Sequence, residues 1–167
     1  SIIDNETTTV QFETPGYIIN ENGGQAAIQV TLSSVAAFSI TVDYATSDGA
    51  TTPATAGSDY TANSGTLTFA PGETSKTIPV AVLDDSAFES NETVNLTLSN
   101  VTPGTTFLGV PSSTTLTILD NEQQPTVKFS STAYSVNEGA NTANITVTLS
   151  AVANAPVTID YATSAGT

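Results

Sequence analysis

The sequence predicts an all-β fold: a seven-stranded antiparallel immunoglobulin-like β-sandwich in a tandem repeat, with the second repeat incomplete. Two observations support the sandwich. Apolar residues alternate with threonine and other polar residues, and turn-forming Pro, Gly, Asn and Asp separate the alternating runs. A third observation supports the repeat, because the sequence matches itself at a nearly constant offset. No stretch has the period of an amphipathic helix.

Seven alternating runs are the predicted strands of the complete repeat. They lie at about 10–20, 25–33, 39–47, 65–69, 75–83, 93–99 and 113–119. Threonine dominates the outward positions, as is typical of a pleated surface that faces water. Turn signals between the runs include Asn22-Gly23-Gly24 and Pro71-Gly72. Because Pro79 cannot donate a ladder hydrogen bond, we expect its strand at a sheet edge, with residue 79 facing away from the ladder.

An internal repeat sets the domain organisation. Val10-Gln11-Phe12 is echoed by Val127-Lys128-Phe129, and Asp43–Ser47 recurs as Asp160–Ser164, in both cases 117 residues later. Self-similarity of this length predicts tandem domains rather than a solenoid of short units. Ile3–Glu6 also matches Leu119–Glu122 at an offset of 116. The predicted domains are the end of the last strand of a preceding repeat (1–6), one complete domain (7–122) and the N-terminal third of a second domain (123–167).

The partial repeat supplies only the first three strands of a sandwich, which should not become ordered alone. Two explanations remain open. Either the sequence is a window on a longer ordered chain, or another copy of the chain completes the sandwich. The second explanation would produce head-to-tail fibres, because a heterologous contact that does not close propagates.

The composition excludes several functional classes. A net charge of −14 argues against nucleic acid and other polyanionic partners. The absence of His and Cys excludes imidazole or thiolate zinc sites, Cys/His nucleophile pairs and disulfides. No long apolar run or basic-apolar leader occurs, so we expect neither membrane insertion nor a retained signal peptide. The start at Ser1 in a chain without Met suggests a piece of something longer.

An acidic turn at 83–92 links two predicted strands. It holds four of the 16 acidic residues, namely Asp84, Asp85, Glu89 and Glu92. Two carboxylates about 4 Å apart repel by about 4 kcal/mol at an effective dielectric constant near 20. Only two basic residues, both lysines, occur in the chain. A divalent cation is therefore the expected counter-ion.

Strand parity gathers further carboxylates around this turn. In a sandwich whose strands alternate in direction, every second connection lies at the same end. That end should hold Glu21, Asp48, the acidic turn, Asp120 and Glu122, whereas the opposite connections hold only Glu73. Calcium accepts about six to eight oxygen ligands in irregular geometry, so it is the first candidate; magnesium, with stricter geometry, is the second. We expect dissociation constants of about 10⁻⁴–10⁻³ M or somewhat tighter.

Several ordered motifs resemble the Calx-β repeat, a family that includes regulatory domains of sodium–calcium exchangers, a part of integrin β4 and large bacterial and cyanobacterial surface proteins. The motifs are Asp43–Gly49, Ala56–Tyr60, Gly65–Phe69, Pro71–Glu73, Asp84-Asp85, Phe88-Glu89 and Glu92. The resemblance covers nearly all of 10–122 and, in truncated form, 127–167. It implies Ca²⁺ at one sandwich tip, with ligands at Glu21, Asp48, Asp84, Asp85, Glu89, Glu92, Asp120 and Glu122. Ser86 and Asn121 replace Asp of the most acidic members, which implies fewer or weaker ions.

Other conspicuous residues have structural explanations. Asp59 is predicted to bond to the backbone of its own turn, and Asp43 to lie on the surface. Tyr44 and Phe88 are predicted core residues. Glu92 and Glu122 could each simply cap a strand end.

Three functions remain. The leading one is a calcium-binding structural module of an extracellular or cell-surface protein, adhesive or fibre-forming, in which the ions rigidify the junction to neighbouring modules. The alternative is a calcium-sensing regulatory domain that signals to a neighbouring domain. A carboxylate-pair enzyme is the third, but a convex loop tip lacks the cleft that a glycosidase needs, so we predict no enzyme activity.

Overall fold

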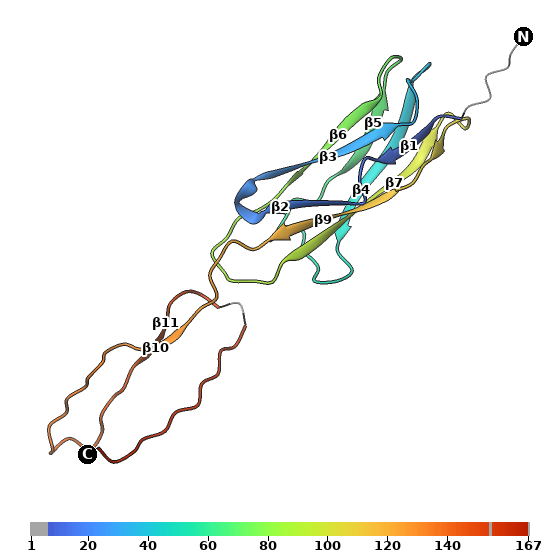
Figure 1. The fold of residues 1–167 in the computed structure, drawn as a ribbon. Coiled ribbons are helices and arrows are strands. Elements are labelled where there is room, and N and C mark those ends of the chain that lie inside the picture. Colours follow the sequence, from blue (N-terminus) through green and yellow to red (C-terminus); the bar gives the residue numbers. More distant parts are fainter. Residues whose placement is uncertain (1–6, 154, 167) are drawn as a thin grey trace, which may run out of the picture. The chain divides into compact units, whose positions relative to one another are not determined.

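The computed structural model describes residues 7–153 and 155–166, and its strands give an all-β fold, as predicted (Figure 1). The preceding-repeat tail predicted at 1–6 lies outside the described residues. Two compact units are present. The first comprises the residues up to Asp85 together with Ser90–Asn121, and the second comprises Ser86–Glu89 and the residues from Glu122 onward.

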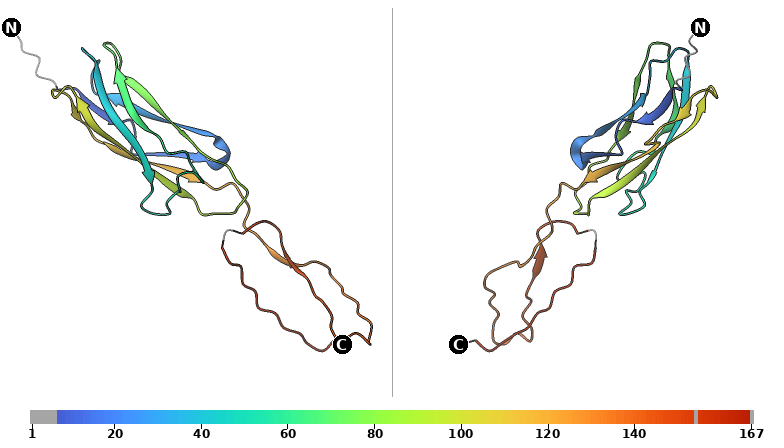
Figure 2. Two further views of the ribbon diagram at one scale, coloured as in Figure 1. Left: turned by 180° about the vertical axis from the view of Figure 1, so that it is seen from behind. Right: turned by 45° about the vertical axis from the view of Figure 1, so that its right-hand side comes forward.

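The first unit is a sandwich of two sheets (Figure 2). One sheet has the order β6-β3-β1-β8, formed by Ser75–Ala81, Gln25–Leu32, Thr9–Phe12 and Phe107–Leu108. The other has the order β2-β9-β7-β4-β5, formed by Gly16–Asn20, Ser113–Leu119, Glu92–Thr102, Ile40–Asp48 and Ser64–Phe69. Alternate side chains of both sheets point inward and form one apolar core, whose largest fully buried members are Tyr60, Phe12 and Phe69.

The strand predicted at 10–20 is divided between the two sheets, which differs from the prediction. Residues 9–12 pair with β3 in one sheet, and residues 16–20 pair with β9 in the other. Pro15 lies in the break, where it has no N–H for a ladder, and the Thr14 hydroxyl donates to the Gly16 carbonyl at 3.1 Å. Both halves also pair in parallel with a neighbour, β1 with the unpredicted β8 and β2 with β9, so the sandwich is not purely antiparallel.

Pro79 occupies the predicted edge position. Its strand, β6, is the outermost strand of the four-stranded sheet. The Pro79 carbonyl accepts a hydrogen bond from Nδ2 of Asn63 at 2.7 Å, outside the ladder with β3. Since the N and C=O of one strand residue point to the same side, the missing N–H also faces away from the ladder.

Aromatic residues differ in part from the expectation. Tyr44 packs half-buried against the core. Phe88 is also half-buried but does not belong to this core, which corrects the prediction; it forms a β-bridge with Ala153 inside the second unit. Tyr60 fills the core instead at 1% exposure, although no alternating strand pattern marks it.

The second unit contains a small antiparallel sheet of β10 (Val127–Phe129) and β11 (Val147–Leu149). The strand expected from the repeat at 157–164 is absent from the described part of this unit. The one helix among the described residues is the 3-10 turn η1 (Glu21–Gly23), so none there is long and apolar enough to cross a membrane.

Candidate metal centre

Three connections and the end of β9 are tied together at one end of the first unit, as strand parity predicted. The amide of Val82 donates to the Gly24 carbonyl at 2.9 Å, and the amide of Leu83 donates to the Asp59 carbonyl at 2.9 Å. These bonds join the β6–β7 connection to the β2–β3 and β4–β5 connections. The end of β9 joins them where the Asp120 amide donates to Oδ1 of Asn91 at 3.2 Å.

Glu21 is the buried carboxylate of this end, at 5% exposure. It begins η1, directly after β2, and Gly24 ends that turn with a φ of 73°, a conformation that glycine adopts without strain. The tight turn also requires Gly23, because a Cβ there would lie 2.7 Å from Cγ1 of Ile19. The Asn22-Gly23-Gly24 turn signal therefore directs Glu21 inward.

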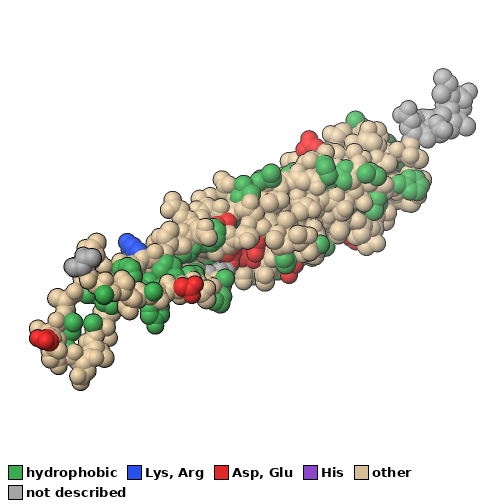
Figure 3. Space-filling view, turned by 60° about the horizontal axis from the view of Figure 1, so that its bottom comes forward, with side chains coloured by type: hydrophobic (Ala, Val, Ile, Leu, Met, Phe, Trp, Pro, Cys, Tyr) green, Lys and Arg blue, Asp and Glu red, His purple; other side chains and the backbone are tan. Residues whose placement is uncertain are grey.

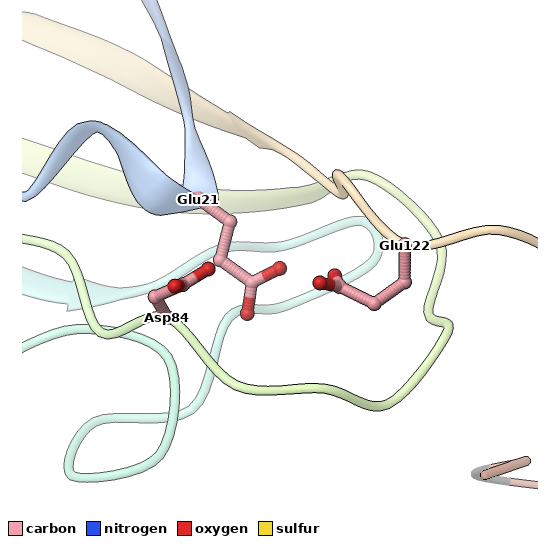
Figure 4. A group of neighbouring side chains, drawn as sticks. All are labelled: Glu21, Asp84 and Glu122. Atoms are coloured by element: carbon pink, nitrogen blue, oxygen red, sulfur yellow. The ribbon is translucent and has the colours of Figure 1, made fainter. Parts of the chain in front are cut away.

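Carboxylates from three separate segments converge at this point. One oxygen each of Glu21, Asp84 and Glu122 lies within 4.8 Å of the other two, and Figure 4 shows the three side chains pointing toward one another. Glu21 and Asp84 belong to the first unit, and Glu122 is joined directly to its last residue, Asn121. At about 4.8 Å two carboxylates repel by about 3 kcal/mol at an effective dielectric constant near 20. Hard oxygen donors in this arrangement suit a hard cation.

A second group consists of Asp59, Glu89 and Glu92, all half-buried, with one oxygen of each within 4.8 Å of the others. Glu89 and Glu92 come from the predicted acidic turn. Asp59 makes the predicted turn bond, since its Oδ2 accepts from the Thr55 amide at 2.6 Å. Its place beside the two glutamates was missed, although one signal was available: Asp59 precedes Tyr60, whose burial fixes the position of this connection.

Asp48 belongs to neither group. Its Oδ1 accepts a hydrogen bond from the Tyr60 hydroxyl at 2.8 Å and another from the Ala56 amide at 3.1 Å. Burial is the larger cause and the hydrogen bond to Asp48 the second cause of a pKa of Tyr60 that is raised to about 12. Asp48 thus braces the β4–β5 connection against the core.

Known proteins share the sequence and the fold of this chain. The model of the Calx-beta domain matches residues 4–122 and, a second time, residues 120–167. The chain belongs to the Calx-beta family. Human sodium/calcium exchanger 2 is 32% identical over 179 residues, covering 98% of this chain and 19% of the exchanger. Rat sodium/calcium exchanger 1 is 31% identical over 184 residues. This chain therefore spans about a fifth of the length of these exchangers.

Solved Calx-beta structures share the fold of the first unit. The apo-form Calx CBD1 domain superposes with a TM-score of 0.64 at 33% identity, covering 70% of this chain and 99% of that domain. The calcium binding domain CBD12 of CALX1.1 gives a TM-score of 0.61 at 33% identity, covering 66% of this chain and 44% of that one.

The remaining predicted ligands lie outside both groups of this Calx-beta domain. Asp85 is exposed beside Asp84, and Asp120 is half-buried two residues before Glu122. Asn121, which stands where the most acidic relatives were expected to carry Asp, has a structural use: its Oδ1 accepts the Asn22 amide at 3.2 Å and so holds η1 beside the end of β9.

The opposite end of the first unit has a different charge arrangement. Glu73 in the β5–β6 turn pairs with Lys76 at 2.8 Å and accepts the Ala70 amide at 2.6 Å. These two hydrogen bonds lower the pKa of Glu73, and the bond from Lys76 has the larger effect. The acid predicted there is thus paired with a lysine at the start of β6. Elsewhere on the molecule, the face drawn in Figure 3 shows several acidic side chains close together.

Proposed function

We propose that this chain is a calcium-binding structural module, with the ion held by Glu21, Asp84 and Glu122. The observation that carries the proposal is the convergence of these carboxylates on one point while Glu21 is 5% exposed. Burying a carboxylate beside a second one is costly unless a cation balances the charge. One structural relative, the CBD12 of CALX1.1, is described as a calcium binding domain, which supports the choice of ion.

Calcium suits this end of the domain better than magnesium. The donors come from turns of irregular geometry, which calcium tolerates and magnesium does not. Asp59, Glu89 and Glu92 form the second candidate position. We propose Asp85 and Asp120 as further ligands, which small movements of their segments would bring to the ion. We propose Asp48 as a further ligand as well. No catalytic role is proposed.

The ion would act on the junction between repeats. Glu122 follows the end of β9 by three residues and begins the segment that leads to β10. An ion shared by Glu122, Glu21 and Asp84 restricts the path of that segment, so the free energy of binding becomes free energy of linker ordering. We propose that such stiffened repeats build an extracellular or cell-surface protein with an adhesive or fibre-forming role.

Thermal unfolding with calcium and with chelator tests the proposal. At a calcium concentration of about 100 times Kd the stabilisation is about 2.7 kcal/mol, which corresponds to a rise in Tm of roughly 10 °C for a domain of this size. Magnesium at the same concentration should raise Tm less. An unchanged midpoint at 10 mM calcium, about 10 to 100 times the expected Kd, would refute calcium binding.

A calcium sensor is the second candidate, favoured by the 32% identity to exchangers over 98% of this chain. A sensor must transmit binding, so calcium would change the relative orientation of the two repeats between two defined states. Small-angle scattering in chelator and in calcium separates the candidates. A stiffening module narrows one distribution of orientations, whereas a sensor exchanges one orientation for another.

A further inference from the structure

Tyr60 is a buried aromatic residue that directly follows one of the converging carboxylates. The two groups of carboxylates are the first position (Glu21, Asp84 and Glu122) and the second position (Asp59, Glu89 and Glu92). Tyr60 is 1% exposed, whereas Asp59 is half-buried. Because neighbouring residues of an extended segment point to opposite sides, the burial of Tyr60 turns Asp59 away from the core.

The backbone of Tyr60 is paired with the residues that follow β6. Tyr60 and Val82 form an antiparallel β-bridge, and beside it the Leu83 amide donates to the Asp59 carbonyl at 2.9 Å. Leu83 immediately precedes Asp84. One ligand of the second position and one of the first are thus fixed on the two sides of the same bridge.

The same short segment also holds the turn that contains Glu21. The Val82 amide donates to the carbonyl of Gly24, the residue that ends η1, at 2.9 Å. Successive amides of an extended segment point to opposite sides, so the amides of Val82 and Leu83 bond in opposite directions. These two residues therefore join the Glu21 turn to the connection that carries Asp59.

Asp59 is also held by bonds within its own connection. Its amide donates to the Thr55 carbonyl at 3.0 Å, and its Oδ2 accepts the Thr55 amide at 2.6 Å. An ionised carboxylate has about four lone-pair sites, so this bond leaves it able to bind a cation. The Tyr60 hydroxyl closes the connection by donating to Oδ1 of Asp48 at 2.8 Å. The placement of Asp59 thus depends on where Tyr60 anchors the connection.

We propose that Tyr60 is a positioning residue for both cation positions, a role that rests on the proposed calcium binding. Its ring fixes the β4–β5 connection to the core, and its pairing with Val82 sets Asp59 and Asp84 relative to each other. Groups that hold a metal ligand in place without touching the metal contribute about 10- to 100-fold to metal affinity. A purely structural tyrosine would change the stability of the domain and leave calcium affinity unchanged.

Tyr60→Leu tests the proposal in calorimetric titrations with calcium. Each position is measured by itself, the second in a Glu21→Gln background and the first in an Asp59→Asn background. Y60L should lower the affinity by at least about tenfold in both backgrounds. Tyr60→Phe should keep most of the affinity, because the ring and the bridge to Val82 remain.

Phe69→Leu is the matched control, because Phe69 is another fully buried aromatic residue of the same core, at the end of β5. F69L should lower Tm as Y60L does while calcium affinity stays unchanged. Equal losses of affinity in Y60L and F69L would show a purely structural role for Tyr60 and overturn the proposal. If the wild-type chain binds no calcium, the proposed function fails and the role of Tyr60 falls with it.

Hydrogen exchange in chelator gives a second measurement, which needs no bound ion. Y60L should speed exchange of the Leu83 and Thr55 amides relative to the amides of β3, because the connection then opens locally. F69L should leave these relative rates unchanged. Unchanged relative rates in Y60L would show that the bridge does not depend on Tyr60 and would overturn the proposal. If Y60L does not fold, Tyr60→Met, which keeps a long apolar side chain, replaces it in both measurements.

Discussion

The hydroxyl of Tyr17 donates to the carbonyl of Gln29 at 3.2 Å, and the hydroxyl of Tyr134 donates to the carbonyl of Thr146 at 2.8 Å. Both members of the second pair are 117 residues after those of the first. The bond in the first unit links β2 of one sheet to β3 of the other, immediately after the chain has crossed between the sheets. The same tyrosine hydrogen bond therefore forms in both repeats, and it depends on nearby segments of the chain rather than on the complete sandwich.

Removing this hydroxyl should destabilise the first repeat. Tyr17→Phe deletes the donor to Gln29 and also the acceptor of the Gln29 amide at 3.1 Å. We expect a loss of about 1–2 kcal/mol and a Tm lower by roughly 4–8 °C in thermal melts. Tyr161→Phe is the matched control, because Tyr161 is 87% exposed and should change little. Equal effects of both substitutions would contradict the claim that the hydrogen bonds of Tyr17 stabilise the first repeat.

Calcium binding should depend on Glu21 and Asp84. Glu21→Gln or Asp84→Asn removes one of the converging carboxylates, and either should lower calcium affinity by at least about tenfold in calorimetric titration. The melt in chelator should stay unchanged or rise slightly, because like-charge repulsion is relieved. The control is Glu13→Gln, which removes an exposed carboxylate between β1 and β2. The ligand assignment fails if E13Q weakens calcium binding as much as E21Q does.

Asp48 should behave differently from Glu21. Asp48→Ala leaves the Tyr60 hydroxyl without its 2.8 Å acceptor in a residue that is 1% exposed, at a cost of about 1–3 kcal/mol. The melt of D48A in chelator should therefore fall, whereas that of E21Q should not. Tyr60→Phe in the D48A background should recover part of the loss, since it removes the unsatisfied hydroxyl. Identical unfolding midpoints for wild type and D48A in chelator would show that the hydrogen bond between Tyr60 and Asp48 contributes nothing to stability.

Asp43 should make stability depend on acid pH. Its Oδ1 accepts from the Thr66 hydroxyl at 2.6 Å and its Oδ2 from the Asn100 amide at 3.0 Å. These bonds lower the pKa of Asp43 below its ordinary value of 3.8, and the bond from Thr66 has the larger effect. Because the folded pKa is the lower one, the contribution is present above about pH 4 and is lost as pH falls through the folded pKa.

Chemical unfolding between pH 2 and pH 7 measures this contribution. Asp43→Asn should be less stable than wild type at neutral pH, and the difference should shrink as pH falls below about 4. Thr66→Val should reproduce part of the effect, since it removes the first of the two donors. A wild-type minus D43N difference that is constant across the range would contradict the assigned pKa direction.

The chain's own patterns determined the fold class and the repeat. Alternation with a period of two is a local property of a strand with one face buried, so it predicted most strands and the edge position of Pro79. Strand parity follows from topology alone, and it correctly brought the connections holding Glu21 and Asp84 to one end. The similarity of the two repeats likewise required only comparison of residues.

Tertiary structure decided what those patterns leave undetermined. The strand expected at 10–20 divides because each half finds its own sheet on either side of Pro15, a choice made by packing rather than by alternation. Asp48 and Asp59 both lie in or beside the same connection, yet Asp48 is held by the buried Tyr60 while Asp59 joins Glu89 and Glu92. Period and parity place a loop at one end of a sandwich. Only the path of its backbone, set by hydrogen bonds and core packing, places a carboxylate within a few ångströms of another.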